Sequence, residues 1–497
     1  MKIQQFLQHH DLAANPFADE DAQTDLIFKG HCITQAYHPT WDKIYGNPAE
    51  PATAIVFGEK GSGKTALRLQ IVRHLADYNL EHPDRRVFVI QYDDFNPFLD
   101  RFRDRFHGRR RQVHRALTHW KPWDHMDAVL SLGVTQLVDR ILQSKHASHP
   151  AAYDQEPLPV GSLERSQARD LLLLCACYDQ STAETTEARW HRLRRKLGFS
   201  TWRSKWDLAV GIAGVLAVVG LIVGLGQWRW LLSPWAYVAA GAAWLPRLWR
   251  MAQRFWVARS VARHTRVLHH NANLVRRILM NFTAGQIVGQ PLPAHQRTDD
   301  RYEMLAKFQA LLRPLGFDGI IALVDRIDEP YLINGSADLM RALVWPMLDN
   351  KLLKHPGIGW KLLLPIELSY FIDREDREFH QRARLDKQNL IRSLEWTGES
   401  LYDLANVRLA ACASAGAPPT MRDWFDDSVD DRRLMDAMRS LRVPRHLFKF
   451  MYRLLVTHTN AHSEKEPVWQ IPRTTFESVL ALYHRDQEAF ERGTGAV

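Results

Sequence analysis

The run from Gly58 to Thr65, GEKGSGKT, combines residue types that can together hold a chain of phosphates. Its glycines let backbone N–H groups turn inward around anionic oxygens, and the N-terminus of a following helix adds a positive field. The Lys64 ammonium can reach the outer phosphates, and the Thr65 hydroxyl can ligate Mg²⁺. The alternative is a glycine-rich turn without a ligand. We expect nine consecutive residues to bind a nucleotide: Gly58, Glu59, Lys60, Gly61, Ser62, Gly63, Lys64, Thr65 and Ala66.

The segments around this run are those that a phosphate-binding loop requires. Residues 53–57 are apolar and predict a buried strand, and residues 65–78 have apolar side chains at helical spacing. Farther along, the apolar run 319–324 predicts a second buried strand, which ends at Asp325. Such a strand delivers a carboxylate to the edge of the sheet where the loop lies. We therefore expect Thr65 and Asp325 to ligate Mg²⁺ together.

Two acids that could act on a bound nucleotide follow in the run VDRIDEP. Glu329 could polarise an attacking water, or it could cap the turn before Pro330. Asp328 is the second candidate for the general base. We name both residues as candidate catalytic groups, because a motif without geometry does not choose between them.

Two uncharged stretches in the middle of the chain, Leu208–Leu225 and Trp230–Pro246, are each near the length of a membrane-spanning helix. Tryptophans 228, 230, 235 and 244 lie near their ends, as in an interfacial belt. Between residues 188 and 298 there are seventeen Lys and Arg and one acid, Asp207, so this segment has a net charge of +16. Because the net charge of the whole chain is +9, the rest of the chain has a net charge of −7. The connecting link carries only Arg229. The flanks hold Arg189, Arg192, Arg194, Arg195, Lys196, Arg203 and Lys205 before the pair, and Arg247, Arg250, Arg254, Arg259, Arg263 and Arg266 after it.

This pattern predicts a two-helix membrane hairpin that contacts lipid through residues 208–246. The protein would then be a multi-pass cell-membrane protein with both termini in the cytoplasm. The alternatives are a buried helical hairpin in a soluble core and a basic patch for nucleic acid. A signal peptide is excluded because the stretch lies two hundred residues into the chain. Gly211, Gly214, Gly220 and Gly224 offer a small-residue face for the partner helix or for a second subunit.

The remaining pattern predicts an α/β fold, with a parallel sheet flanked by helices, an inserted transmembrane hairpin and a C-terminal helical lid. Further strands are expected at 86–92, 360–365 and 390–394, and helices at 123–142, 163–177, 247–280, 301–312 and 400–411. We expect four parts: 1–185 with the phosphate-binding loop, 186–284 with the hairpin and its linking helix, 285–412 with Asp325, and 413–497 as the lid. The four cysteines show neither metal-site spacing nor a disulfide pattern.

The segment Val443–Phe448, VPRHLF, precedes an amphipathic helix and resembles the sensor-2 segment of AAA+ ATPases related to origin-recognition factors. The resemblance implies that Arg445 meets the γ-phosphate from a lid helix and acts in catalysis. The alternative is a basic residue in the first turn of an ordinary helix. An arginine finger from a neighbouring subunit could come from four residues, and nothing in the sequence selects among Arg374, Arg377, Arg382 and Arg384.

Taken with Asn15-Pro16-Phe17, these motifs look like those of a bacterial AAA+/STAND-type P-loop ATPase, with Gly58–Thr65 as Walker A and Asp325 ending Walker B. A transmembrane hairpin between the two motifs is similar to the KAP group of P-loop NTPases. The chain departs from that group at Arg326, where a second acid is usual. The resemblance implies ATP and Mg²⁺ as ligands, and a homo-oligomer or a protein partner.

These motifs lead to one expected function and two alternatives. The first is a membrane-anchored NTPase that hydrolyses ATP to drive a conformational or assembly change at the cytoplasmic face, in defence or signalling. The second, favoured by Arg326, is a nucleotide-dependent switch or scaffold with little turnover. The third and weakest is an ATPase whose basic segment contacts DNA.

Overall fold

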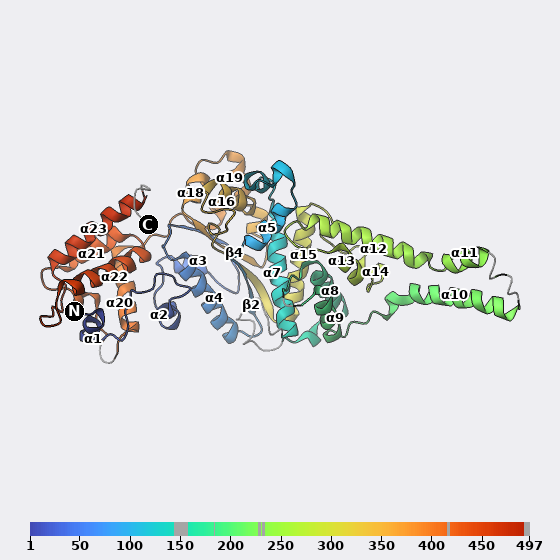
Figure 1. Cartoon of the computed structure of the whole chain (residues 1–497), viewed down its shortest axis with the longest axis horizontal. Coiled ribbons are helices and arrows are strands. Elements are labelled where there is room, and N and C mark those ends of the chain that lie inside the picture. The colour runs from blue at the N-terminus through green and yellow to red at the C-terminus, as the bar shows by residue number, and fades with distance from the viewer. Residues whose placement is uncertain (144–157, 183, 227–229, 231–233, 415–417, 492–497) are drawn as a thin grey trace. The chain divides into compact units, whose positions relative to one another are not determined.

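The computed structural model describes residues 1–143, 158–182, 184–226, 230, 234–414 and 418–491 (Figure 1). By its internal contacts the chain separates into two compact units. Unit 1 comprises Met1–His82, Leu323–Glu329 and Leu353–Val497, and unit 2 comprises Pro83–Ala322 and Pro330–Leu352. The predicted four-part division at residues 185, 284 and 412 stays a prediction.

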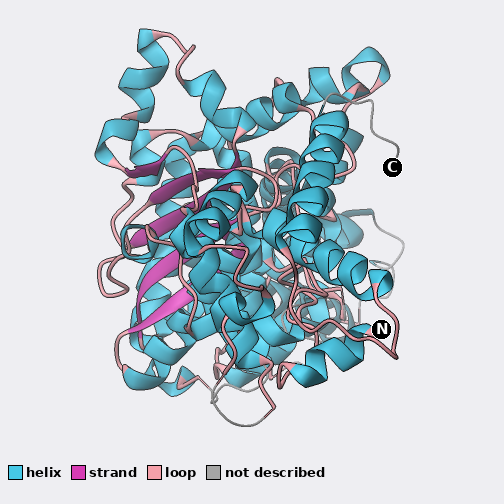
Figure 2. Ribbon diagram, turned by 90° about the vertical axis from the view of Figure 1, so that its left-hand side faces the viewer, coloured by secondary structure: helices cyan, strands magenta, loops and turns pink. Residues whose placement is uncertain are grey.

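A five-stranded parallel sheet, in the order β2-β3-β4-β1-β5, confirms the predicted α/β class (Figure 2). Its strands are β1 (Ala54–Gly58), β2 (Arg86–Tyr92), β3 (Phe317–Val324), β4 (Ile358–Pro365) and β5 (Asn389–Ile391). Every residue of β1 and β4 is buried, as expected for central strands covered on both faces. The predicted edge strand at 390–394 is shorter than expected and ends at Ile391.

The register of the strands places the end of β4 beside the start of the loop Gly58–Thr65. Gly58 pairs with Pro365, and the Ile366 N–H donates to the Gly58 carbonyl at 3.1 Å. Lys361 of β4 is fully buried, and its ammonium donates to three backbone carbonyls, those of Ile44, Tyr45 and Ala52, at 2.7 to 3.0 Å. Burial lowers the pKa of Lys361 to about 8. This contact ties the segment before β1 to the sheet.

The helices of unit 1 fall into those near the sheet strands and those of the C-terminal region. The first group contains α2 (Leu26–Gly30), α3 (Trp41–Tyr45), α4 (Lys64–Glu81), α18 (Glu367–Ile372) and α19 (Arg377–Ala383). The second contains α1 (Ile3–His9), α20 (Gly398–Ala411), α21 (Asp431–Leu441), α22 (Pro444–Ala461) and α23 (Arg473–Glu491).

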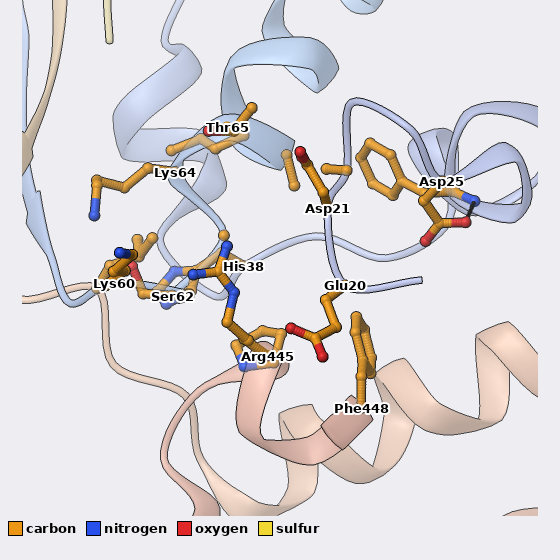
Figure 3. Close-up of a pocket in the computed structure, with 18 of the residues that line it drawn as sticks. Glu20, Asp21, Asp25, His38, Lys60, Ser62, Lys64, Thr65, Arg445 and Phe448 are labelled. Atoms are coloured by element: carbon orange, nitrogen blue, oxygen red, sulfur yellow. Dashed lines mark hydrogen bonds between the residues drawn. The ribbon is translucent and has the colours of Figure 1, made fainter. Parts of the chain in front are cut away.

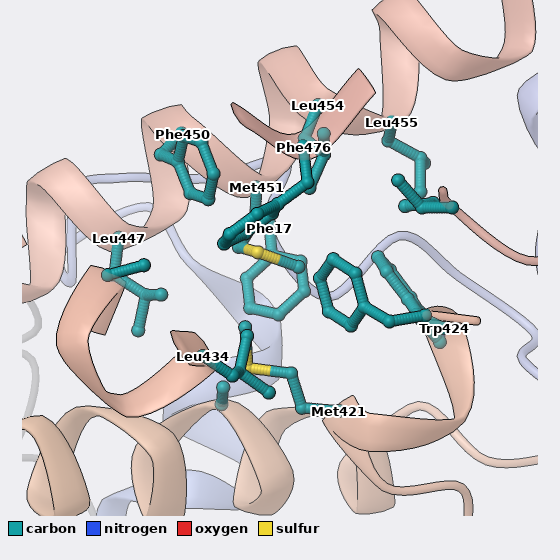
Figure 4. Close-up of a cluster of buried hydrophobic side chains, with 14 of the residues drawn as sticks. Phe17, Met421, Trp424, Leu434, Leu447, Phe450, Met451, Leu454, Leu455 and Phe476 are labelled. Atoms are coloured by element: carbon teal, nitrogen blue, oxygen red, sulfur yellow. The ribbon is translucent and has the colours of Figure 1, made fainter. Parts of the chain in front are cut away.

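The C-terminal helices share one apolar core with the start of the chain (Figure 4). The Phe6 and Phe17 rings both meet Trp424 edge-on, with centroids 5.5 and 5.8 Å apart. The Met1 ammonium also donates to the Thr459 carbonyl at 3.2 Å. The helical region from α20 onward is therefore completed by the N-terminal segment.

Unit 2 is built from helices around the long, largely buried α7. Its helices are α5 (Asn96–Asp104), α6 (Val113–Leu117), α7 (Pro122–Leu142), α8 (Arg165–Tyr178), α9 (Thr186–Lys196), α10 (Trp206–Gly224), α11 (Pro234–Ala242), α12 (Leu245–His264), α13 (Ala272–Leu279), α14 (Ala284–Ile287), α15 (Thr298–Leu312) and α16 (Ala337–Val344). The short α17 (Asn350–Leu353) ends where the chain returns to unit 1. The predicted helix over 247–280 is wrong: α12 ends at His264, and Asn271 caps a separate α13 by accepting from the Asn273 N–H.

Buried acids on α7 pair with arginines from distant parts of unit 2. Asp139 accepts from Arg189 at 2.7 Å, Asp124 from Arg266 at 2.5 Å and Asp127 from Arg301 at 3.1 Å. Charges this deeply buried require such partners, because desolvation is costly. Arg189 and Arg266 belong to the basic flanks that the sequence placed at a membrane surface. Their side chains instead hold unit 2 together, so fewer charges remain to face a membrane.

Among the described residues, one helical stretch, Trp202–Gly224, is long and apolar enough to cross a membrane by length and composition, and little of it is buried. The second predicted stretch, 230–246, is divided: α11 covers Pro234–Ala242 and α12 begins at Leu245. A two-span hairpin is therefore not shown. Gln227, Trp228 and Arg229 of the predicted link lie outside the described residues.

The predicted small-residue face divides into two halves on α10. A Cβ at Gly211 would contact Trp244, and one at Gly214 would overlap Ala243, so these glycines permit close packing within the chain. Nothing in the described structure lies within 4 Å of a Cβ added at Gly220 or Gly224. The base of α10 is held by Asp207, which pairs with Arg250 of α12 at 3.1 Å.

Candidate functional site

The predicted phosphate-binding loop joins β1 to α4 and lines a pocket that lies wholly within unit 1 (Figure 3). Gly61 and Gly63 have φ angles of 91° and 95°, which residues with a Cβ rarely adopt. Gly63 is also the N-cap of α4, an 18-residue helix whose N-terminus therefore opens at the loop. The local geometry offers backbone N–H groups and a helix dipole to an anion.

Lys64 folds back over the loop. Its Nζ donates to the carbonyl oxygens of Gly58 at 2.7 Å and Glu59 at 3.0 Å. Burial lowers the pKa of Lys64, while the nearby carboxylates of Asp328 and Asp325 raise it. An ammonium held only by neutral carbonyls can move to an anionic ligand without breaking an ion pair.

Thr65 and Asp325 meet as the sequence predicted. The Thr65 hydroxyl donates to Asp325 Oδ2 at 3.3 Å, directly after the end of β3. Burial raises the pKa of Asp325, and the neighbouring Arg68 and Lys64 charges lower it. The two oxygens form the start of a donor set that Mg²⁺ prefers.

Arg68 is a site residue that the sequence analysis missed. Its Nε lies 3.3 Å from Asp325 Oδ2, and both side chains are almost completely buried. The position could have been found from helix geometry, because Arg68 follows Thr65 by three residues and so faces the same side of α4. Its guanidinium neutralises the carboxylate that would otherwise be fully available to a metal ion.

Asp328 and Glu329 both line the pocket, but their surroundings differ. Arg326 adopts a left-handed backbone conformation with φ of 62°, and its Nε donates to Glu329 Oε1 at 2.9 Å. Glu329 is thus already paired and half exposed. The Asp328 charge acts on Lys64, which places this carboxylate near the loop lysine.

Arg445 reaches the phosphate-binding loop from the first turn of α22. Its backbone N–H donates to the Gly61 carbonyl at 3.3 Å, and a Cβ added at Gly61 would lie 2.6 Å from the Arg445 Cβ. Helix α22 and the loop are therefore in direct contact. Among the described residues that line the pocket, none is one of the four finger candidates, Arg374, Arg377, Arg382 and Arg384.

Apolar and aromatic side chains form the wall of the pocket on the side away from the loop. The sequence analysis did not predict this apolar wall. It includes Phe28, His38, Trp396 and Phe448. Trp396 Nε1 donates to the Ser62 carbonyl at 2.9 Å, and the His38 ring meets Trp396 edge-on at 5.0 Å. Burial lowers the pKa of His38, so the ring is neutral near pH 7. This wall suits a flat aromatic group beside the phosphate-binding loop.

The Asn15-Pro16-Phe17 run supports that wall through Arg408. Arg408 Nε donates to the Pro16 carbonyl and its Nη1 to Asp25, both at 2.6 Å. The guanidinium carbon also lies 4.4 Å from the centre of the Phe448 ring. Asp25 in turn accepts from the Phe28 N–H and so caps α2. The run thus has a structural role at the rim of the pocket.

The cations of the pocket divide into paired and unpaired groups. Arg68, Arg326 and Arg408 each have a carboxylate partner. In the part of the chain that the structure describes, the exposed Lys60 makes no ion pair, and neither do Lys64 and Arg445. The Lys64 and Arg445 charges face the loop and are available to an anion.

Comparison with known proteins leaves the family open: no protein-family model, no curated protein and no solved structure matches the chain.

Proposed function

We propose that the unit 1 pocket binds ATP with Mg²⁺, with its phosphates on the loop Gly58–Thr65. The observation that carries the proposal is the meeting of two unpaired cations, Lys64 and Arg445, at a glycine loop that opens the N-terminus of α4. Such a site favours a highly charged anion over a neutral ligand. Thr65 and Asp325 would hold the metal ion, which would neutralise charge on the phosphates.

The apolar wall supports a nucleotide rather than inorganic phosphate as the ligand. His38, Trp396 and Phe448 provide aromatic surface for a base. Trp396 is hydrogen-bonded to the loop at Ser62. The surface for the base is therefore joined directly to the surface for the phosphates. This continuity suits a ligand with a planar ring joined to a phosphate chain.

We infer that the lid responds to the nucleotide through Arg445. The contact between Arg445 and Gly61 joins α22 to the loop, so a γ-phosphate bound by this guanidinium would tie the two together. Loss of that phosphate would leave only the backbone contact between Arg445 and Gly61 and so weaken the connection. The protein would then be an ATP-dependent conformational switch, in which α22 is held more firmly to the loop when ATP is bound than when it is not.

Two contacts favour a switch with slow turnover as the second candidate. Arg68 pairs with Asp325 and neutralises its charge, and Arg326 pairs with Glu329, so that Glu329 is not free to act as a base. Rapid hydrolysis would require both arginines to give up these carboxylates. Of the carboxylates around the loop, Asp328 has the largest effect on the pKa of Lys64. It is the better candidate for the general base.

We expect Asp328→Asn to lower ATP turnover more strongly than Glu329→Gln, by on the order of 10²-fold against a few-fold, because general-base contributions are of that size. ATP binding should stay within a few-fold of the unchanged protein for both variants. Steady-state phosphate release and equilibrium ATP binding on the purified proteins would measure the two effects. Greater loss of turnover in Glu329→Gln would reverse the assignment.

We also propose that α10 attaches the protein to a membrane. The support is its length and composition, and the exposure of large apolar side chains that continue onto α11 and α12. Leu216, Trp235, Trp249 and Trp256 are each more than 60% exposed, at 64%, 76%, 69% and 68%. Water disfavours such a surface, whereas a bilayer and its interface would cover it.

A hairpin through the bilayer predicts opposite accessibility for two introduced cysteines. Gln227→Cys, in the predicted outer link, should react with an impermeant thiol reagent on intact cells, whereas the exposed Arg195→Cys should react only after lysis. The four native cysteines are buried and need not be removed. Labelling of both positions before lysis, or release of the protein without detergent, would contradict the two-span arrangement.

A further inference from the structure

A second pocket, of about 620 Å³, lies in unit 2, and four of its ten lining residues are arginines. It is formed by the end of α5, the last turns of α12 and the segment that joins α12 to α13. The charged side chains around it are Arg101, Asp104, Arg105, Arg259 and Arg263. Arg259 and Arg263 belong to the basic flank described above, but the sequence did not indicate that they line a pocket.

Two of these charges are already satisfied. Arg105 Nη1 donates to the Ala262 carbonyl at 2.8 Å, and its Nη2 donates to the carbonyls of Thr265 and Leu268 at 3.2 Å. Arg105 thereby caps the C-terminal end of α12. Asp104 pairs at 3.0 Å with Arg111, which does not line the pocket. The acid therefore offers little negative charge to the other arginines.

The other three arginines have no such partner. Within the described residues, Arg101, Arg259 and Arg263 make no ion pair. Arg259 and Arg263 are four residues apart on α12, so they lie on one face of the helix and repel each other. Partial burial lowers the pKa of Arg101, which reflects the cost of keeping its charge here. A counter-charge inside the pocket would relieve both the repulsion and the desolvation.

A buried acceptor completes the pocket. His270 lines it, and its Nε2 is buried without a hydrogen-bond partner, while the ring is hydrogen-bonded to the Cys177 backbone. Burial and the adjacent arginines lower the pKa of His270 to about 3, so the ring is neutral. A neutral ring that donates from its other nitrogen presents a lone pair at Nε2. That lone pair suits the hydroxyl of a monoprotonated phosphate.

We propose that this pocket binds a phosphate-bearing anion, either a soluble phosphate or a lipid headgroup. Three guanidinium groups supply many N–H donors around one volume, which matches the several oxygens of a phosphate better than the two of a carboxylate. The residues belong to unit 2, and none of them lines the unit 1 pocket. Binding here would act directly on α12, which continues from the apolar surface of α10 and α11.

The test uses pyrophosphate as the soluble probe and the full chain carrying Lys64→Ala, so that binding at the loop in unit 1 is weakened and the unit 2 pocket accounts for the tighter site. Calorimetric titration should show binding that Arg259→Gln and Arg101→Gln each weaken about tenfold, the effect of losing one charge-assisted hydrogen bond. Arg195→Gln removes the same charge from an exposed helix outside the pocket and should leave the affinity unchanged. Matching thermal unfolding curves for the variants would show that each one folds.

Vesicles distinguish the two sources of phosphate. Flotation with vesicles of phosphatidylcholine and phosphatidic acid, compared with phosphatidylcholine alone, should be reduced by Arg259→Gln and competed by pyrophosphate if the ligand is a headgroup. Pyrophosphate binding without a difference between the vesicles would assign a soluble ligand. Absence of binding to either probe would overturn the proposal, and so would equal losses in Arg195→Gln and Arg259→Gln.

Discussion

Replacing Lys64 with alanine should weaken ATP binding by at least about a hundredfold, since two charge-assisted hydrogen bonds of roughly 1.5 to 3 kcal/mol each would be lost. Lys64 is held only by the Gly58 and Glu59 carbonyls and is free to turn to the β- and γ-phosphates. Arg445 is anchored to Gly61 through its own backbone N–H, and we assign its guanidinium to the γ-phosphate. It cannot replace the charge that Lys64→Ala removes.

Lys60 provides the matched control for this prediction. It is an exposed lysine of the same loop, and we assign the phosphate contact at this position to the backbone N–H and not to the side chain. Lys60→Ala therefore removes the same charge and should change ATP affinity only a few-fold. Equal losses in the two variants would show that net charge, and not the position of Lys64, determines binding.

Arg301→Met should lower the melting temperature of the protein by roughly 5 °C, because removing one partner of a buried ion pair costs about 3–5 kcal/mol. Arg301 is fully buried and contacts both oxygens of Asp127 at 3.1 Å. The substitution would leave Asp127 buried without its cationic partner, while the Tyr178 hydroxyl still donates to it at 2.9 Å. Differential scanning calorimetry would measure the loss.

Two further variants separate this effect from a general loss of charge. Arg277→Met breaks an ion pair with Glu187 at 3.2 Å in which both side chains are partly exposed, so it should shift the melting temperature by no more than about 3 °C. Adding Asp127→Leu to Arg301→Met removes both members of the buried pair and should recover most of the loss. An unchanged melting temperature in Arg301→Met would mean that the pair does not hold unit 2 together.

Patterns of apolar residues were sufficient to predict the sheet, because the central strands β1 and β4 are buried on both faces and leave continuous apolar runs. The sequence also anticipated that Thr65, Asp325 and Arg445 would approach one loop. Local spacing predicted the ends of α20 and β3 within a few residues, since both elements end at clear changes of polarity. These features depend on short segments and on one topological rule for parallel strands.

Other parts of the site depend on contacts between distant segments and could not be predicted in this way. The pairing of Arg408 with Pro16 joins residues 392 positions apart. The apolar wall takes His38, Trp396 and Phe448 from three separate regions. The sequence assigned all the arginines of the basic flanks to a membrane surface for a related reason. A count of charges does not reveal that Arg189 and Arg266 have buried acidic partners.

The most direct test of the central claim is calorimetric titration of the unaltered protein with ATP, in the presence and absence of Mg²⁺. We expect saturable binding to one site per chain, tighter with Mg²⁺ because Thr65 and Asp325 lie together at the loop. AMP, which lacks the phosphates that Lys64 and Arg445 would meet, should bind far more weakly. Absence of ATP binding to folded protein, or equal affinity for ATP and AMP, would contradict the account.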